Sequence, residues 1–272
     1  MRVGYVQFAP EFGEVSGNLD RAAELVARER ADLWVLPELF STGYQFVSVQ
    51  ELERLAEPVP DGRTTVGLTD LARERRCHFV AGLAERTDHG VYNSAVLVGP
   101  SGLLAVYRKV HLFYEEKDLF SPGDLPFPVA DIGQAKVGLL VCYDHFFPEA
   151  ARSLALQGAE VIAHPANLVM PGLAQLTMRV RAMENRVFTL TANRIGTEAR
   201  TGETLRFTGL SQVVAPNGDV LVQAAQDAEE VRVVEIDLSQ ARDKHLTRLN
   251  DVFADRRPEF YDALCASGGP PR

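Results

Sequence analysis

Three residues combine side-chain types that support nucleophilic catalysis: a cysteine, a glutamate and a lysine. Cys142 closes the apolar run 136–141, and Pro148, a residue favoured in the first turn of a helix, follows six positions later. A thiol between a strand and a helix faces the positive end of that helix, which together with a nearby cation lowers the thiol pKa from about 8.5. The same turn can direct backbone N–H groups at an oxyanion. A cysteine that ends a buried strand is more often an inert core residue, so Cys142 needs partners to support this hypothesis.

Glu38 and Lys109 are the candidate partners, because each ends or follows a strand-like run. Glu38 lies in the segment 34–40 with apolar neighbours on both sides, a setting that suits a general base. Lys109 ends the run 105–109 and precedes further apolar residues, so its ammonium group can stabilise a thiolate or the oxygen of a tetrahedral intermediate. The alternatives are a surface or helix-capping glutamate, and a lysine that extends from an edge strand into water.

Other kinds of site have no support in the residue spacing. The six histidines form no HExxH motif and the three cysteines form no CxxC pair, so we expect no metal site. A GxSxG serine motif, a P-loop and a GxGxxG loop are also absent from the sequence. We therefore expect neither a metal ion nor a bound nucleotide at the site.

The composition indicates a protein that acts on small molecules. Its 272 residues, 46% of them hydrophobic, can bury a full core, and we expect a single domain over residues 1–265 with a flexible tail at 266–272. The net charge of −9, from 28 basic and 37 acidic residues, disfavours nucleic acid and anionic membranes as partners. No segment resembles a signal peptide or a membrane span, and three widely spaced cysteines do not suggest a disulfide framework. We therefore expect a cytoplasmic protein.

Short apolar runs alternate with amphipathic stretches, a pattern typical of strands buried under helices. We predict strands at 2–8, 33–36, 78–83, 92–98, 103–109, 136–141, 161–163, 189–192, 211–214 and 231–236. We predict helices at 18–30, with Asn18 as N-cap, and at 63–76, 148–157, 174–185, 238–246 and 258–263. The turn 99–102 and the Asn217-Gly218 pair, which is favoured in type I′ turns, indicate antiparallel hairpins. We therefore expect an α/β fold in which two mixed sheets pack together under helices.

Three segments together resemble the signature regions of the nitrilase, or carbon–nitrogen hydrolase, superfamily. They are LPELFSTGY, YRKVHLF with EEKDLFSPGD, and CYDHFFPEAARSLALQGAEVIAHPAN. Their order and spacing agree with that family, and the resemblance extends from VGYVQFAP to DVFADRRPEFY. It implies a four-layer αββα sandwich that forms homodimers or larger homo-oligomers. It also implies a catalytic set of Glu38, Lys109 and Cys142 with Glu116 as a second glutamate, and no cofactor.

The resemblance implies a role for each of these side chains. Glu38 takes the proton of Cys142, whose sulfur attacks the substrate carbon, and Lys109 and the backbone N–H of Tyr143 hold the oxyanion. Glu38 then protonates the departing ammonia and activates the water that hydrolyses the thioester. Glu116 orients Lys109 or the substrate nitrogen; without the resemblance it would belong to a solvated run of charges.

The residues after Cys142 differ from the commonest family pattern. Many members read CYDLRFPE, whereas His145 and Phe146 stand here in place of Leu and Arg, which weakens the case for a substrate with a carboxylate. The pair Phe146-Phe147 resembles carbamoyl-putrescine-type amidases and thermophilic archaeal nitrilases that act on small aliphatic nitriles, and HPANLVMP adds to the archaeal likeness. Nitrilases usually place Trp-Glu after the cysteine, where this chain has Tyr143-Asp144. We therefore rank a small linear amide first, with a small nitrile or an N-carbamoyl amine as alternatives.

Further residues are expected near the pocket or at a subunit interface. Tyr44, Phe146 and Asn167 follow motif elements and are expected to line the pocket, with ordinary packing as the alternative. We predict a structural ion pair between Glu184 and Arg186 near the subunit interface. Candidate interface residues in the C-terminal region are Phe253, Phe260 and Tyr261.

Two other functions remain as rivals. An acyltransferase or amidotransferase would add a synthetase domain or membrane segments, and the sequence has neither. A non-catalytic binding scaffold would keep the sandwich without turnover, and the retention of all four expected catalytic residues argues against it.

Overall fold

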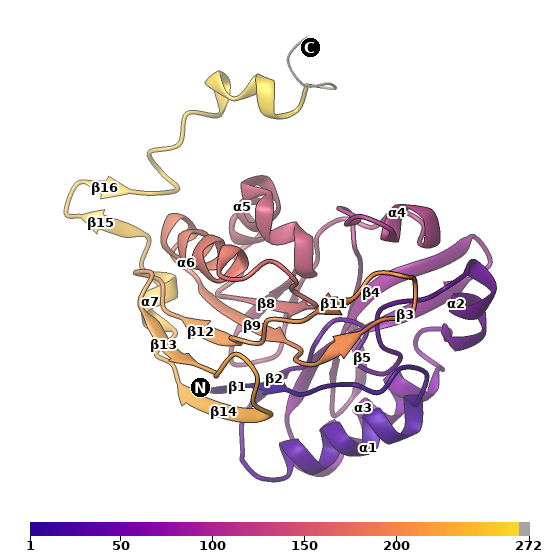
Figure 1. Ribbon diagram of the computed structural model, residues 1–272. Helices are drawn as coiled ribbons and strands as arrows, with labels where there is room; N and C mark the ends of the chain where they lie inside the picture. The colour runs from indigo at the N-terminus through magenta and orange to yellow at the C-terminus, as the bar shows by residue number, and fades with distance from the viewer. Residues whose placement is uncertain (267–272) are drawn as a thin grey trace.

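Two six-stranded sheets form the centre of the molecule (Figure 1). The computed structural model describes residues 1–266, so residues 267–272 of the predicted tail lie outside the described range. The first sheet has the strand order β14 (Glu230–Glu235), β1 (Arg2–Gln7), β2 (Leu33–Val35), β3 (His78–Thr87), β4 (Gly90–Gly99), β5 (Gly102–Arg108). The second has the order β13 (Val220–Gln223), β12 (Gln212–Val214), β9 (Phe188–Asn193), β8 (Val161–Ala166), β7 (Lys136–Leu139), β6 (Val129–Asp131).

Both sheets are mixed, as the hairpins in the sequence predict. In the first sheet β1–β2 and β2–β3 are parallel, and in the second β7–β8 and β8–β9 are parallel; the other pairs are antiparallel. Parallel neighbours need a crossover connection, and helices supply it each time. These helices are α1 (Val15–Val26), α2 (Val49–Leu55) with α3 (Arg63–Arg75), α5 (Pro148–Leu156) and α6 (Leu173–Asn185).

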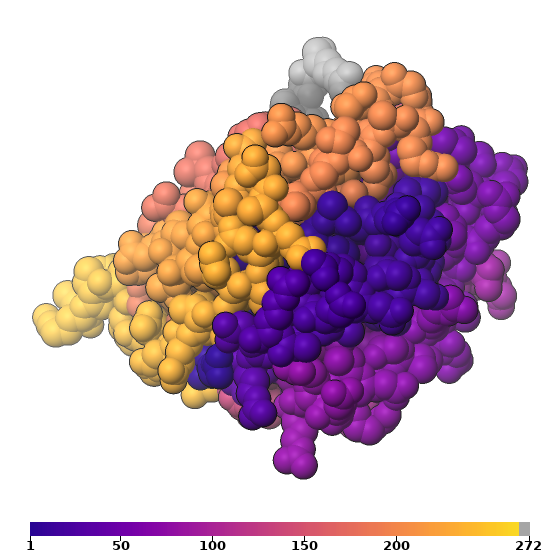
Figure 2. Space-filling view, turned by 60° about the horizontal axis from the view of Figure 1, so that its bottom comes forward, coloured from indigo at the N-terminus to yellow at the C-terminus, as the bar shows by residue number. Residues whose placement is uncertain are grey.

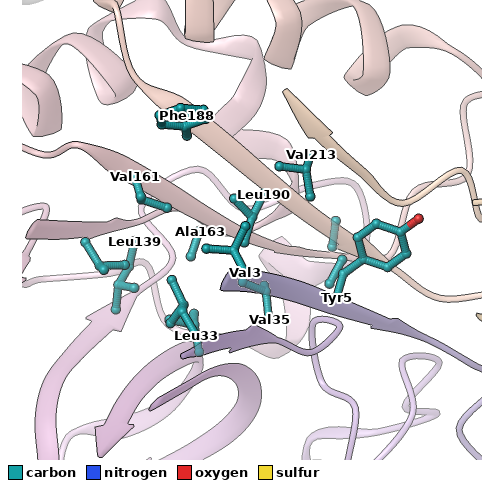
Figure 3. Close-up of a cluster of buried hydrophobic side chains, with 14 of the residues drawn as sticks. Val3, Tyr5, Leu33, Val35, Leu139, Val161, Ala163, Phe188, Leu190 and Val213 are labelled. Atoms are coloured by element: carbon teal, nitrogen blue, oxygen red, sulfur yellow. The ribbon is translucent and has the colours of Figure 1, made fainter. Parts of the chain in front are cut away.

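Three apolar clusters explain why the elements stack in four layers. Side chains from the facing sides of both sheets interlock in a central core that includes Val3, Leu33, Leu139, Val161 and Leu190 (Figure 3). The outer face of the first sheet packs on α1 and α3, and the outer face of the second packs on α5 and α6. The predicted αββα sandwich is confirmed.

The start of the first helix differs from the prediction. Helix α1 begins at Val15, so Asn18 lies inside it and is not its N-cap. The Asn18 side chain instead joins the helix to two loops, because its amide donates to the carbonyl oxygens of Glu11 and Ser41 at 2.7 and 2.9 Å. An asparagine used for this purpose looks like a cap in the sequence, because both roles use the same short polar side chain.

Both predicted hairpins form, but the second has a different turn. In the β12–β13 hairpin the Gly218 N–H donates to the Ala215 carbonyl, which places Pro216 and Asn217 at the centre of the turn. Gly218 has a φ of 87° and Asn217 has no positive φ. Because proline fixes a negative φ, the turn is of the type I kind followed by a glycine bulge, not type I′.

The C-terminal region departs most from the predicted helices. Helix α7 (Ser239–Arg242) stops early, because the Asp243 carboxylate accepts from the His245 backbone N–H at 3.0 Å. The predicted helix 258–263 consists of two short 3-10 turns, Pro258–Phe260 and Asp262–Leu264. The sequence predicts neither α2 nor β6. It also does not predict α4 (Glu116–Leu119) or the strand pairs β10 (Thr197–Glu198) with β11 (Leu205–Arg206) and β15 (His245–Thr247) with β16 (Asn250–Asp251).

The predicted Glu184–Arg186 ion pair is wrong. Glu184 pairs with Arg181 at 2.8 Å, one turn earlier on the same helix, where the two side chains share a face. Arg186 has left the helix with a φ of 49° and donates to the carbonyl oxygen of Asp243. Within residues 1–266, no helix combines the length and the apolar character needed to cross a membrane.

Candidate active site

Cys142 lies where the chain leaves β7 and makes a sharp turn toward α5. It is the first residue of a 3-10 turn, Cys142–Phe146, and its φ of 45° is in a region that residues other than glycine rarely adopt. A strained backbone of this kind persists only where the surroundings fix it, and it is common at functional sites.

Asp144 fixes the turn from one side. Its buried carboxylate accepts from the Val141 backbone N–H at 2.9 Å and from the Tyr107 hydroxyl at 2.8 Å. The His111 ring nitrogen Nδ1 lies 2.7 Å from the other carboxylate oxygen. Tyr107 lies on β5 of the first sheet, and Asp144 lies in the turn that follows β7 of the second sheet. The Asp144 carboxylate therefore also joins the two sheets.

His164 on β8 fixes the turn from the other side. Its Nε2 lies 2.9 Å from the carbonyl oxygen of Cys142, and its Nδ1 lies 3.1 Å from the Thr191 hydroxyl. A carbonyl can only accept, so Nε2 carries the proton and Nδ1 accepts from Thr191. Burial lowers the pKa of His164, which keeps the ring neutral in this arrangement.

A buried ion cluster lies beside this turn. The Lys109 ammonium, directly after β5, donates to Glu38 Oε1 at 2.7 Å and to Glu116 Oε1 at 2.8 Å. All three side chains are almost completely excluded from solvent. Cys142 is close enough that the charges of all three act on its pKa. The structure therefore brings together the four residues that the sequence and the family resemblance predict.

Glu38 has one carboxylate oxygen occupied and one free. Oε1 accepts from Lys109 and from the Asn93 side-chain amide, each at 2.7 Å, whereas Oε2 is buried without a hydrogen-bond partner among the described residues. Gly82 on β3 lets the chain pass this close, because a Cβ there would lie 2.5 Å from the Glu38 Cα. Sequence analysis missed Asn93, which lies within a strand, and only its polar character among apolar neighbours could have identified it.

Glu116 is held by Tyr44. The Tyr44 hydroxyl donates to Glu116 Oε1 at 2.7 Å, and the Phe113 backbone N–H donates to Oε2 at 3.0 Å. The backbone N–H groups of Tyr44 and Gln45 in turn donate to the Glu198 carboxylate, at 3.1 and 2.6 Å. Tyr44 therefore touches the ion cluster, as expected for a residue that borders the site.

The charges of the cluster explain its protonation states. Burial alone would lower the pKa of Lys109, but Glu116 and Glu38 outweigh it and hold the pKa well above its usual range. Burial raises the pKa of Glu116, and Lys109 opposes this effect. One ammonium between two carboxylates stays charged because removing its proton would leave two negative groups without a buried counter-ion.

The pKa of Cys142 contradicts the prediction from sequence. Burial and the negative charge of Glu38 raise the pKa of the Cys142 thiol well above its usual value, although Lys109 and the Asn167 backbone N–H act in the opposite direction. A standing thiolate would add a further negative charge to a buried site that already holds two carboxylates. The resting group is therefore a thiol, and it needs a base at the moment of attack.

A small cavity borders the sulfur. The cavity opens to solvent, and the space between its lining atoms, with the open part included, is about 320 Å³. It is lined by Cys142 and by Phe113, Tyr143, His145, Asn167, Leu168, Val169, Met170, Leu173 and Ala174. A second space, which shares Phe113 and Val169 with the first, reaches Tyr44 and Glu116.

Three other residues were predicted at the site, and two of them, Asn167 and Tyr143, line the cavity. Asn167 follows β8, is buried beside the cavity, and has no hydrogen-bond partner within residues 1–266 for either polar atom of its side chain. Tyr143 lines the cavity, whereas Phe146 does not; it is 48% exposed and stacks on the Tyr143 ring. His145 also lines the cavity, and the sequence marks it only as a departure from the family pattern.

Across the described range, no three His, Cys, Asp or Glu residues are grouped so that they could hold a metal ion. The chemistry that these residues can do is nucleophilic attack by sulfur with a carboxylate base and an ammonium electrophile.

Comparison with known proteins gives consistent results. The family model described as carbon-nitrogen hydrolase matches residues 2–245. A nitrilase of Pyrococcus abyssi (strain GE5 / Orsay) is 49% identical over 96% of this chain and 99% of its own length. An N-carbamoylputrescine amidase of Solanum lycopersicum is 33% identical over 98% of this chain and 95% of its own length.

Two solved structures have the same fold. A carbon-nitrogen hydrolase from Helicobacter pylori G27 has a TM-score of 0.88 and 28% identity, and the match covers 98% of this chain and 99% of the other. A variant of the amidase from Nesterenkonia sp. AN1, in which acrylamide has added to the active-site cysteine, has a TM-score of 0.79 and 29% identity, with 97% and 99% covered.

Proposed function

The chain is an enzyme of the carbon–nitrogen hydrolase family, and we propose that it hydrolyses a small linear amide through a thioester on Cys142, releasing ammonia. The observation that carries this proposal is the cluster of Lys109 between Glu38 and Glu116 beside a buried thiol. The proposed unit is one domain over residues 1–265 that needs no cofactor.

In the first half-reaction Glu38 takes the proton of the thiol as the sulfur bonds to the carbonyl carbon. Its free Oε2 is the oxygen available for that proton, because Oε1 is already occupied by Lys109 and Asn93. Lys109 and the Tyr143 backbone N–H stabilise the oxyanion. The carbon–nitrogen bond then breaks, Glu38 returns its proton to the nitrogen, and ammonia leaves a thioester behind.

The second half-reaction releases the acid. Glu38 accepts a proton from water, whose oxygen bonds to the thioester carbon. As the carbon–sulfur bond breaks, Glu38 passes that proton to the sulfur, which restores the thiol and the free carboxylate. Glu116 does not move a proton in this scheme. It is held by Tyr44 and Phe113 and keeps Lys109 charged and oriented.

The amide ranks above the nitrile on chemistry, and the nitrile is the second candidate. An amide forms an oxyanion when sulfur attacks its carbonyl, which suits the fixed ammonium of Lys109. The 49% identity to the Pyrococcus abyssi nitrilase favours a small aliphatic nitrile, and the plant relative favours an N-carbamoyl amine. The small cavity supports a compact substrate in each case.

Ammonia release tests the proposal. Wild type and Cys142→Ala are incubated with a panel of short aliphatic amides, carbamoyl amines and aliphatic nitriles. We expect ammonia from the amides with wild type and none with the variant, and mass spectrometry of quenched wild type should detect the acyl group on Cys142. Faster release from nitriles would favour the second candidate, and silence over the whole panel would favour a binding scaffold.

We also propose that the protein forms a homodimer through its C-terminal arm, residues 244–266. The arm leaves the body of the molecule (Figure 1), and the space-filling view shows part of it projecting from the surface (Figure 2). Its exposed apolar side chains include Leu246, Leu249, Phe260 and Leu264. Surfaces of this kind mark association sites. Light scattering of the full chain, beside a chain ending at Asp243, should give a dimer and a monomer.

We propose a cytoplasmic location because the cysteines form no disulfide bonds in the described residues. Cys77, Cys142 and Cys265 are all free, which agrees with a reducing compartment. Cell fractionation with an antibody to the protein tests it.

A further inference from the structure

His145 lies in the 3-10 turn that begins with Cys142, at the wall of the cavity. His145 is 3% exposed and lines the same cavity as Cys142. Nδ1 lies 2.6 Å from the Thr177 hydroxyl, and that hydroxyl donates to the Ala174 carbonyl at 3.2 Å. The role proposed above for the catalytic set does not use this histidine.

These two contacts fix which nitrogen of His145 carries the proton. The Thr177 hydroxyl has a single hydrogen, and with that hydrogen assigned to the Ala174 carbonyl the hydroxyl accepts from the ring. Nδ1 is therefore the donor. Nε2 then has a lone pair and no hydrogen-bond partner within the described residues, and it can accept an N–H from a molecule in the cavity.

The ring stays neutral at physiological pH. Burial, helped by His164 and Arg181, lowers the pKa of His145 to about 3. Arg181 is the nearby cation, but it is paired with Glu184 and donates to the main-chain oxygen of His145, so it is not free to bind an anion in the cavity. The cavity wall therefore offers a neutral acceptor at this point and no free positive charge.

Asn167 provides a second unpaired polar group in the same cavity. Its side chain is 97% excluded from solvent, and both its amide nitrogen and its carbonyl oxygen lack partners within residues 1–266. A buried amide without hydrogen-bond partners destabilises the protein, so such a group is expected to meet a ligand or water. Around these two residues the lining is apolar, with Leu168, Val169, Met170 and Leu173.

We propose that His145 and Asn167 form a subsite for a neutral carboxamide at the non-reacting end of the substrate. This inference rests on the proposed function, and it names the substrate class as short diamides. A carboxamide offers N–H donors to His145 Nε2 and Asn167 Oδ1, and a carbonyl to Asn167 Nδ2. Its short methylene chain contacts the apolar lining.

A carboxylate at that end fits poorly. It has no N–H to donate to His145, and the cavity has no free cation to replace its lost water. The ion cluster, with two carboxylates and one ammonium, adds repulsion. One turnover of a diamide uses one water, breaks one carbon–nitrogen bond and leaves one ammonia and a half-amide acid. The half-amide is a carboxylate, so hydrolysis stops after one equivalent of ammonia.

The test compares butanediamide, its half-amide succinamate, and butanamide, which has the same chain length without the second polar group. With wild type we expect one equivalent of ammonia from the diamide, a kcat/KM for the diamide about tenfold or more above that for butanamide, and almost no turnover of succinamate. A factor of ten is the size expected for one hydrogen bond between neutral groups. These comparisons need no variant, so they hold even if a substitution at His145 prevents folding.

Substitutions at His145 then test whether the preference for the diamide over butanamide comes from the subsite. His145→Leu should lower the diamide-to-butanamide ratio of kcat/KM about tenfold, and His145→Gln, which keeps an acceptor, should lower it less. His89→Leu, at the exposed turn between β3 and β4, is the matched control and should keep the wild-type ratio.

The outcomes separate the two proposals. Turnover of butanamide and succinamate as fast as the diamide, or an unchanged ratio in His145→Leu, overturns the subsite and leaves the proposed amidase intact. No ammonia from any of the three amides overturns both.

Discussion

From β14 to β5 the strand pairings of the first sheet run antiparallel, parallel, parallel, antiparallel, antiparallel, and from β6 to β13 the second sheet repeats that order. In this correspondence β2 matches β8 and β1 matches β7. Glu38 follows β2, whereas the neutral Asn167 follows β8. Cys142 lies three residues after β7, and the same position after β1 holds Pro10, which has no nucleophilic group.

The two halves of the molecule, each built on one of the six-stranded sheets, therefore contribute different chemistry to one site. The first half supplies every charge of the cluster, from Glu38, Lys109 and Glu116. The second half supplies the strained nucleophile and neutral hydrogen-bonding groups, among them His145 and Asn167. Keeping the ionised groups in one half of the molecule lets them neutralise each other, so the sulfur faces a pre-formed base and cation without bringing a charge of its own.

Removing the nucleophile should give the largest effect. Cys142→Ala leaves the charged half complete but should lower kcat by at least about 10⁴-fold, because no covalent intermediate can form. The measurement is ammonia release at saturating substrate. Cys77→Ala, another buried cysteine packed against the first sheet, is the control and should keep wild-type turnover. Residual activity within tenfold of wild type would assign the chemistry to another group.

Neutralising the base should rank second. Glu38→Gln keeps the shape of the side chain but cannot take the thiol proton, so kcat should fall by about 10³-fold. Glu85→Gln, a buried glutamate on β3 that pairs with Arg108, is the matched control. If both variants lose activity equally, the loss reflects disturbed packing of the first sheet and not the loss of a base.

Removing the only ammonium of the cluster tests whether the charges support one another. Lys109→Met leaves Glu38 and Glu116 buried without a counter-ion, so the free energy of unfolding should fall by about 3–5 kcal/mol. Adding Glu116→Gln should recover part of that loss, because one unpaired charge is removed. Urea unfolding of the three proteins measures both effects. A double variant no more stable than the single one would contradict this explanation.

Acid should destabilise the half of the molecule that is built on the second sheet and contains His145. The pKa of His145 is about 3 in the folded chain and 6.5 in the unfolded one, so between these values only the unfolded chain binds the proton. The free energy of unfolding should therefore fall as the pH is lowered from about 6.5 toward 3, by at most about 1.4 kcal/mol per pH unit from this group. His145→Leu should flatten that slope in urea unfolding at pH 7, 6 and 5, whereas His89→Leu should not.

The sequence by itself determined the elements and the residue types of the site. Alternating apolar runs predict the long central strands but not β6 or the two short strand pairs, and the hairpin signals predict mixed sheets, because both depend on local periodicity and turn residues. Three motifs with agreeing order and spacing identify the family and four site residues. Local patterns failed where one side chain serves two purposes, as with Asn18, or where a single carboxylate ends a helix, as with Asp243.

Only the tertiary structure decided how these residues act. Lys109 and Glu38 are 71 positions apart, and no local pattern could place Asn93 against them or leave one Glu38 oxygen free. The pKa of Cys142 was predicted to fall because the sequence shows a helix and a cation, but the structure raises it by burial. Desolvation depends on what surrounds a group in three dimensions, and the two sheets supply those surroundings only when they pack together.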